Sequence, residues 1–172
     1  DAINLAKSNG AVISYDPNLR LNLWPCAEEA KNKIIEAIPL ADIIKVNDEE
    51  IFFITGEKDI KKGIQKLISK GPKLCIVTMG AKGCIYSTSK YTGLMPAFKV
   101  RTVDATGCGD SFVAGLLAGV AERGLDCLIG DQRKIVYVLK FASAAAAITS
   151  TRKGVIASLP CRADVEKFLS KL

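Results

Sequence analysis

The chain has 172 residues, of which 49% are hydrophobic and 24% are charged, and its formal net charge is +6. Length and composition are typical of a soluble globular protein with one domain or a large piece of one. No apolar run reaches the length of a membrane span and no signal segment opens the chain, so we expect a cytoplasmic protein without a membrane partner.

Helix-like and strand-like patterns alternate along the chain. Helices are predicted over residues 1–10, 26–38, 47–56, 59–71, 110–120, 131–151 and 162–172, and strands over 11–16, 42–46 and 73–80. Residues 83–100 show short β-like runs separated by turn residues, which is typical of a hairpin. Strands that alternate with helices predict a mostly parallel sheet flanked by helices. Because residues 1–10 resemble the tail of a helix, we expect the chain to be the C-terminal part of something longer.

The histidine and cysteine content of the chain limits the kinds of catalytic and metal site that it can contain. Histidine is absent, which excludes Ser-His-Asp and Cys-His nucleophiles and most zinc sites. The six cysteines form no CxxC pair, so neither a zinc ribbon nor a redox motif is predicted. In a chain of this length we expect the cysteines to be reduced and mostly buried.

A glycine-rich loop runs into a helix at residues 104–120, DATGCGDSFVAGLLAGV. Gly107 and Gly109 let a ligand approach the backbone closely, and unpaired N–H groups at a helix start attract an anion. Asp110 lies in the first turn, where a carboxylate either complements the helix dipole or accepts the proton of an attacking hydroxyl. The adjacent glycines favour the second role. We expect the buried face of this helix to consist of Phe112, Val113, Leu116, Leu117 and Val120.

The stretch DATGCGDSF resembles the C-terminal signature D-T-x-G-A-G-D-x-F of the ribokinase/PfkB family of carbohydrate kinases. Ala105 and Cys108 are small departures from that pattern. Further segments resemble the family in the same order: DPNLRLNLW (16–24), as in fructokinase-like members, KVNDEE (45–50), which carries an N-x-x-E motif, TMGAKGC (78–84) and FASAAAAITSTRKGVIASLP (141–160). The resemblance covers essentially all 172 residues.

The resemblance implies an α/β fold, a ribokinase-like αβα sandwich with a mostly parallel sheet. Residues 1–172 would be its C-terminal portion, without the N-terminal sugar-binding half and its lid. The implied activity is ATP-dependent phosphorylation of a sugar hydroxyl, with fructose as the best guess and fructose 6-phosphate as product. In the full-length protein, the lid would allow a homodimer.

The resemblance also implies roles for single residues. Asp110 would be the base, and the amides of Gly107, Cys108 and Gly109 would stabilise the transferring phosphoryl group. The residues implied around ATP are Thr78, Gly80, Gly83, Asn47 and Ser143, the last in a place where asparagine is usual. Glu50 would hold Mg²⁺ through water. The positions implied for a monovalent cation, K⁺, are Asp104, Ala105, Thr149, Gly154 and Ser158.

Several of these residues also have purely structural explanations. The DPN stretch suits a turn after a strand, and Asn47 with Glu50 suits a helix N-cap. Gly80 and Gly83 suit a hairpin turn. Lys45 we expect to be a solvated lysine at a strand end.

Two other functions stay open at this stage. A catalytically silent family member or fragment could bind nucleotide or a partner. Every charged residue between 61 and 101 is Lys or Arg, and such a stretch could meet nucleic acid. Scattered lysines without interleaved aromatic residues are more typical of a solvated surface, so we expect no nucleic-acid partner.

Overall fold

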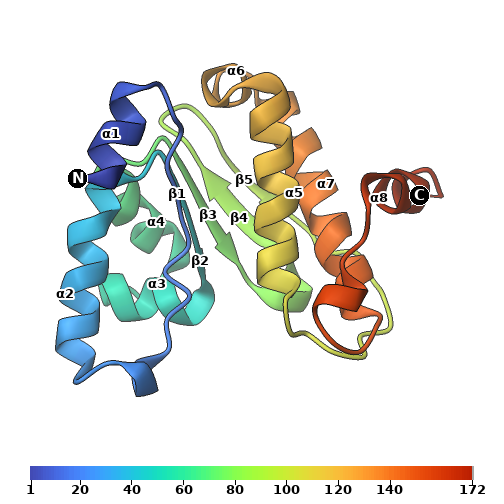
Figure 1. The fold of residues 1–172 in the computed structure, drawn as a ribbon, viewed down its shortest axis with the longest axis horizontal. Helices are drawn as coiled ribbons and strands as arrows, with labels where there is room; N and C mark the ends of the chain where they lie inside the picture. Colours follow the sequence, from blue (N-terminus) through green and yellow to red (C-terminus); the bar gives the residue numbers. More distant parts are fainter. Residues whose placement is uncertain (172) are drawn as a thin grey trace. The chain divides into compact units, whose positions relative to one another are not determined.

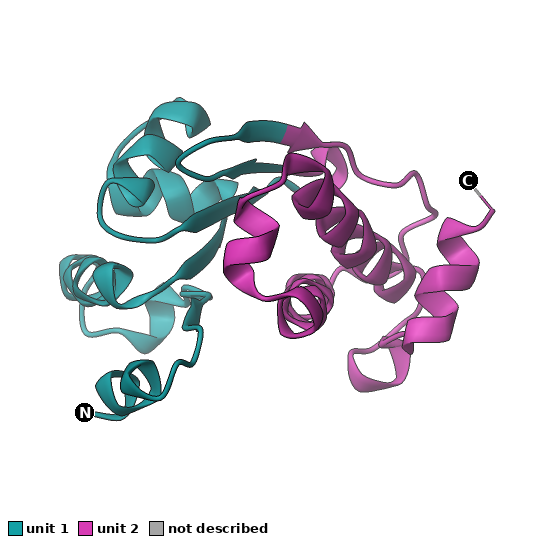
Figure 2. Cartoon of the chain, turned by 90° about the horizontal axis from the view of Figure 1, so that it is seen from above, with its two compact units in different colours: residues 1–79, 85–93 teal, residues 80–84, 94–172 magenta. Residues whose placement is uncertain are grey.

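The computed structural model describes residues 1–171, which form two compact units (Figure 2). Unit 1 comprises residues 1–79 and 85–93, and unit 2 comprises residues 80–84 and the chain from residue 94 onward. Within residues 1–171, no helix is both long and apolar enough to cross a membrane.

A five-stranded sheet has the strand order β1-β2-β3-β4-β5 (Figure 1). Its strands are β1 (Ser14–Tyr15), β2 (Ile43–Asn47), β3 (Leu74–Thr78), β4 (Cys84–Ser87) and β5 (Thr92–Met95). The first three strands pair in parallel, and Asn47 at the end of β2 stands opposite Thr78 at the end of β3. The predicted parallel strands and the 83–100 hairpin are therefore confirmed, although β1 is much shorter than expected.

Eight α-helices are found within residues 1–171. Unit 1 contains α1 (Ala2–Ser8), α2 (Ala27–Ala37), α3 (Asp48–Thr55) and α4 (Ile60–Ile68), and unit 2 contains α5 (Cys108–Arg123), α6 (Leu125–Ile129), α7 (Gln132–Ser150) and α8 (Arg162–Leu169). The short helix α6 was not predicted. Short 3₁₀ turns are found at Leu21–Leu23, Ile38–Leu40, Gly80–Lys82 and Ile156–Ser158.

The core of unit 1 lies between the sheet and the helices α2, α3 and α4 (Figure 1). Ile44 and Val46 of β2 belong to this core. Because side chains alternate along a strand, Lys45 and Asn47 point to the opposite face of the sheet. The buried side chains of Ile43 and Ile76 lie on that face as well.

The core of unit 2 is built where α5 packs along α7. A methyl group added at Gly119 would lie 2.5 Å from Cγ1 of Val138, and one at Gly115 would lie 2.8 Å from Cα of Ala142. The two helices therefore approach each other through glycine, which lacks the side chain that would separate them. The terminal helix α8 packs on α7, where the rings of Phe98 and Phe168 meet edge to face at 5.2 Å.

Two expectations about burial are wrong. Leu117 is 37% exposed and Val113 is half-buried, because the face of α5 that meets α7 runs through its glycines. Of the six cysteines only Cys75 and Cys84 are buried, and burial raises the pKa of each thiol to about 12.

We predict that Gly119→Ala destabilises the protein, because the new methyl group collides with Val138. The expected loss is about 1–3 kcal/mol of the free energy of unfolding, the usual cost of overpacking. Val138→Ala removes both colliding methyl groups and leaves only a Cβ 3.1 Å away. In that background the change should cost much less, since alanine favours a helix over glycine by about 0.5–1 kcal/mol. Urea unfolding followed by circular dichroism measures both effects.

Gly115→Ala is the matched control, because its methyl group meets backbone of Ala142 that truncation of Val138 cannot move. It should remain destabilising in both backgrounds. An equal cost of Gly119→Ala with and without Val138 would contradict the close packing.

Candidate active site

The glycine loop ends at the start of α5, where Gly107 is the N-cap residue in a left-handed conformation with φ of 79°. The amides of Gly107, Gly109 and Asp110 donate to no other residue within the range 1–171, whereas the Cys108 amide donates to the carbonyl of Ala105 at 3.2 Å. Three of these N–H groups are therefore free for an anion, and the expectation that Cys108 also offers its amide does not fit this geometry.

Asp110 is exposed in the first turn of this helix. In the described part of the chain its carboxylate has no hydrogen-bond or ion-pair partner. An unpaired carboxylate beside free amides suits proton acceptance next to a bound anion better than a purely structural role.

Asp104 ties the loop to the segment that follows α7. Its Oδ1 accepts hydrogen bonds from the amide of Thr106 at 2.9 Å and from the hydroxyl of Thr106 at 2.7 Å. Its Oδ2 accepts from the amide of Gly154 at 3.1 Å, and the carbonyl of Ser150 accepts from the amides of Val103 and Asp104. The two segments are thereby joined into one polar junction.

The hydrogen bonds from the hydroxyl and amide of Thr106 and from the amide of Gly154 hold the pKa of Asp104 below its ordinary value. The carboxylate therefore keeps its charge at ordinary pH. The stability that it contributes is fully present above the ordinary pKa of an aspartate and is lost as the pH falls through this lowered pKa.

The other residues predicted to hold a monovalent cation lie around the same junction. Ala105 adjoins Asp104, and buried Thr149 precedes Ser150 and bonds to the hydroxyl of Ser111 at 2.9 Å. The hydroxyl of Ser158 donates to the carbonyl of Lys153, next to Gly154. Carboxylate and carbonyl oxygens are the donors that a hard cation prefers, so the residues present fit such an ion.

Val155 was not predicted as a site residue, yet it covers the loop. A methyl group added at Gly107 would lie 2.6 Å from Cγ1 of Val155. Gly107 therefore has two reasons to be glycine: its left-handed backbone and the side chain seated on it. No sequence pattern links these two residues, which lie far apart in the chain.

Residues predicted around ATP in unit 2 have structural partners of their own. The hydroxyl of Ser143 interacts with the buried thiol of Cys84 and lowers that thiol's pKa in part. Gly83 has φ of 92°, and a side chain there would overlap the carbonyl of Met95. Gly80 begins a 3₁₀ turn with φ of 54° and open space around it. Gly83 thus fits the hairpin-turn explanation, and Gly80 alone leaves room for a ligand.

In unit 1, polar side chains follow the three parallel strands. Asp16 comes directly after β1, Asn47 ends β2 and Thr78 ends β3, where its hydroxyl donates to the carbonyl of Val46 at 3.4 Å. The carboxyl ends of parallel strands meet at one edge of a sheet, which is where ligands bind in open α/β folds.

Asn47 and Glu50 form the capping box of α3. The Glu50 amide donates to Oδ1 of Asn47 at 2.7 Å, and Oε2 of Glu50 accepts from the Asn47 amide at 2.8 Å. The second carboxylate oxygen, Oε1, accepts from the amide of Leu19 at 2.8 Å. Glu50 is only 4% exposed, so it does more than complement the helix dipole.

Lys45 is buried, which makes the expectation of a solvated lysine wrong. Its Nζ pairs with Oδ2 of Asp16 at 3.1 Å, across 29 positions of sequence. The signal in the sequence was a lysine inside the otherwise apolar run of a buried strand, although its partner could not be seen there.

A magnesium ion fits only part of this donor set. No cluster of three or more Cys, Asp or Glu side chains is placed to hold a metal ion within residues 1–171. Of the two carboxylates near the strand ends, that of Asp16 is paired with Lys45, whereas each oxygen of Glu50 has a lone pair left beyond the hydrogen bond it accepts. This suits Mg²⁺ that keeps its waters and is held mainly by substrate phosphates.

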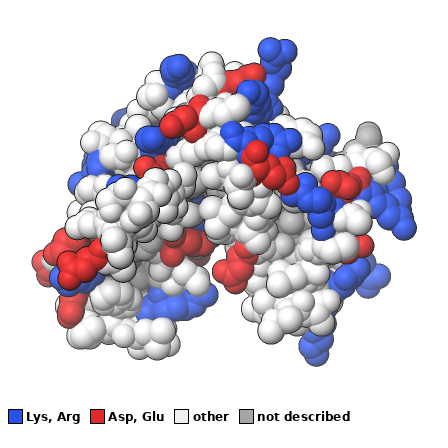
Figure 3. Space-filling model, turned by 45° about the horizontal axis from the view of Figure 1, so that its top comes forward, with Lys and Arg blue, Asp and Glu red and all other residues white. Residues whose placement is uncertain are grey.

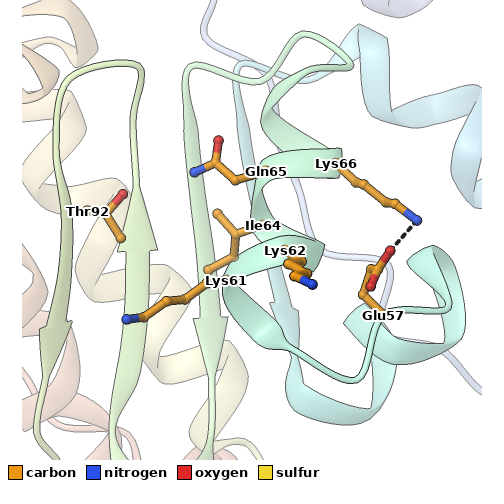
Figure 4. A pocket seen from close by; sticks show the side chains of 7 residues that line it. All are labelled: Glu57, Lys61, Lys62, Ile64, Gln65, Lys66 and Thr92. Atoms are coloured by element: carbon orange, nitrogen blue, oxygen red, sulfur yellow. Dashed lines mark ion pairs between the residues drawn. The ribbon is translucent and has the colours of Figure 1, made fainter.

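A surface pocket of about 570 Å³ lies elsewhere in unit 1, beside α4 and β5 (Figure 4). It is lined by Glu57, Lys61, Lys62, Ile64, Gln65, Lys66 and Thr92. Lys66 is paired with Glu57 at 2.5 Å, and none of the predicted site residues lines the pocket. On the face seen in Figure 3, basic side chains are interspersed with acidic ones rather than gathered in one patch.

The chain is similar to known proteins over nearly its whole length. The model of the pfkB family carbohydrate kinases matches residues 1–162. Fructokinase-2 of Solanum habrochaites is 45% identical over 169 residues, which are 98% of this chain and 51% of the relative. Fructokinase-1 of Zea mays is 43% identical over 171 residues, 99% of this chain and 52% of the relative. The chain spans about half the length of these relatives.

Solved structures show the same fold. A fructokinase from Vibrio cholerae O395, in a fructose, ADP and calcium ion bound form, superposes with a TM-score of 0.89 at 34% identity, covering 98% of this chain and 54% of that one. The aminoimidazole riboside kinase from Salmonella enterica gives a TM-score of 0.87 at 29% identity, covering 98% and 56%. The predicted ribokinase-like α/β fold is confirmed, and the chain belongs to the pfkB family of carbohydrate kinases.

Proposed function

We propose that this chain is the C-terminal part of an enzyme that transfers the γ-phosphoryl group of ATP to a hydroxyl of fructose, giving fructose 6-phosphate. The observation that carries the proposal is the exposed, unpaired carboxylate of Asp110 beside the free amides at the start of α5. Fructose is favoured as the sugar because the most similar relatives that we compared are fructokinases and the Vibrio cholerae enzyme holds fructose and ADP.

In this mechanism the residues of the loop act together. The amides of Gly107, Gly109 and Asp110 bind the transferring phosphoryl group, whose negative charge is stabilised by the helix start. The Asp110 carboxylate orients the sugar hydroxyl and accepts its proton. Val155 lies against Gly107 and helps to keep the loop in place.

Ions have supporting roles in the proposal. When bound, Mg²⁺ would neutralise charge on the phosphates of ATP. Glu50 and Asn47 would hold that ion's waters, and the junction around Asp104 would hold K⁺. Thr78, Gly80 and Ser143 would lie along the nucleotide. From the same resemblance we propose a cytoplasmic location and a homodimer of the complete enzyme.

We predict that Asp110→Asn lowers sugar-dependent ADP release by about 10²–10⁴-fold, because an amide cannot accept the hydroxyl proton. Binding of ATP should be nearly unchanged, since the loop amides remain. The assay is a coupled measurement of ADP release by the complete protein with a panel of sugars, beside a direct titration of nucleotide binding.

Asp126→Asn is the matched control, because Asp126 lies in the first turn of α6, away from the glycine loop. It should leave the rate unchanged. If the unaltered protein binds ATP while no sugar drives ADP release, the chain is a silent nucleotide-binding member instead.

We also predict that Asp104→Ala raises the K⁺ concentration for half-maximal activity by about tenfold or more. The change removes the acceptor of three charge-assisted hydrogen bonds, and with it the carboxylate that would face the ion. Asp131→Ala is the control, because Asp131 caps α7 through the amide of Arg133 and has no part in the junction. A K⁺ dependence that is identical in both variants would remove the cation from the proposal.

A further inference from the structure

Lys45 and Glu50 are the only buried charged residues within residues 1–171, at 7% and 4% exposure of the whole residue. They lie on different elements, β2 and the first turn of α3. Both nevertheless bind the same short segment, residues 16–19, which leaves β1 and passes the start of α3 (Figure 1). Two buried charges that bind one segment require an explanation, because taking a charge out of water costs free energy.

The first attachment fixes the beginning of the segment. Asp16 and Lys45 have side chains only 19% and 9% exposed, and their ion pair spans 3.1 Å. The other oxygen of Asp16 accepts from the amide of Asn18 at 3.3 Å. Asn18 is held in a left-handed conformation with φ of 45°, so the chain turns sharply here.

The second attachment fixes the end of the segment. The amide of Leu19 donates to Oε1 of Glu50 at 2.8 Å, while Oε2 of Glu50 is bound to the amide of Asn47. Each oxygen of this carboxylate thus has one backbone donor, and one of the two donors belongs to the segment that Lys45 holds. The orientation of Glu50 therefore depends on where residues 16–19 lie.

Stability alone does not account for the arrangement. Replacing a buried ion pair by apolar side chains of similar size is often neutral or stabilising. What such a pair supplies here is a fixed position for a loop at the carboxyl ends of the parallel strands.

We propose that Lys45 is a positioning residue: through Asp16 it holds residues 16–19 against Glu50 and so orients the carboxylate that would meet hydrated Mg²⁺. The expected effect on Mg²⁺ binding rests on the proposed kinase function, whereas the attachment of residues 16–19 through Lys45 and Asp16 does not.

Lys45→Met in the complete protein tests the inference, because methionine keeps the length of the side chain and loses the charge. Amide hydrogen exchange should show the Leu19 amide exchanging about tenfold faster or more, as expected for loss of a charge-assisted bond. The Mg²⁺ concentration for half-maximal ADP release should rise by a similar factor. A loss of folded protein would lower the rate and leave this half-saturation value unmoved.

Two further variants and a control sharpen the test. Lys45→Arg should restore both readouts in part, since the guanidinium can still meet Asp16. The double variant with Lys45→Met and Asp16→Leu replaces the ion pair by apolar side chains and leaves no buried charge unpaired. It should show the same faster Leu19 exchange and the same higher Mg²⁺ requirement, and it serves in place of Lys45→Met where that single variant does not fold. Lys33→Met breaks the exposed pair of Lys33 with Glu36 and should change nothing.

The inference is overturned if the Leu19 amide stays protected in the double variant. It is also overturned if that amide is released and the Mg²⁺ dependence stays the same. If the unaltered protein releases no ADP with any sugar, the proposed function fails. The Leu19 exchange then still decides whether Lys45 holds the segment.

Discussion

The carboxylate of Asp104 is the constraint on which the candidate active site depends. Two hydrogen bonds from Thr106 fix the glycine loop itself, and one from the amide of Gly154 joins that loop to the segment after α7, where Val155 lies against Gly107. The amides of Gly107, Gly109 and Asp110 at the start of α5 have no partner among residues 1–171. A helix start with unpaired N–H groups attracts an anion, and Asp110 stands directly beside it.

In unit 1 the polar groups near the strand ends are paired with one another, in contrast to the unpaired amides at the start of α5. At the ends of its parallel strands, the polar groups satisfy one another: Lys45 pairs with Asp16, and Glu50 binds the amides of Asn47 and Leu19. The result is a fixed polar edge rather than a set of free donors. A hydrated cation with its phosphates needs such oriented oxygens, whereas a transferring phosphoryl group needs free N–H groups.

The sequence predicted features set by local patterns and missed those set by distant partners. The helices α2 and α3 and the strands β2 and β3 follow from periodicity and end signals, and the glycine loop follows from its composition. The burial of Lys45 depends on Asp16, 29 positions away, and the exposure of Leu117 depends on which face of α5 meets α7. Helix α6 spans only five residues, too few for a periodic pattern. The family resemblance pointed to the glycine loop as a site, but only the structure showed that the Cys108 amide donates to the carbonyl of Ala105 and is not free.

Transfer of the phosphoryl group at the start of α5 is tested most directly by a crystal structure of the complete protein with ADP, Mg²⁺, fructose and aluminium fluoride, a mimic of the transferring phosphoryl group. We expect the mimic about 2.7–3.1 Å from the amides of Gly107, Gly109 and Asp110. We also expect a fructose hydroxyl within about 2.6–3.2 Å of the Asp110 carboxylate. A mimic bound away from these amides, or a sugar beyond reach of Asp110, would show that the transfer takes place elsewhere.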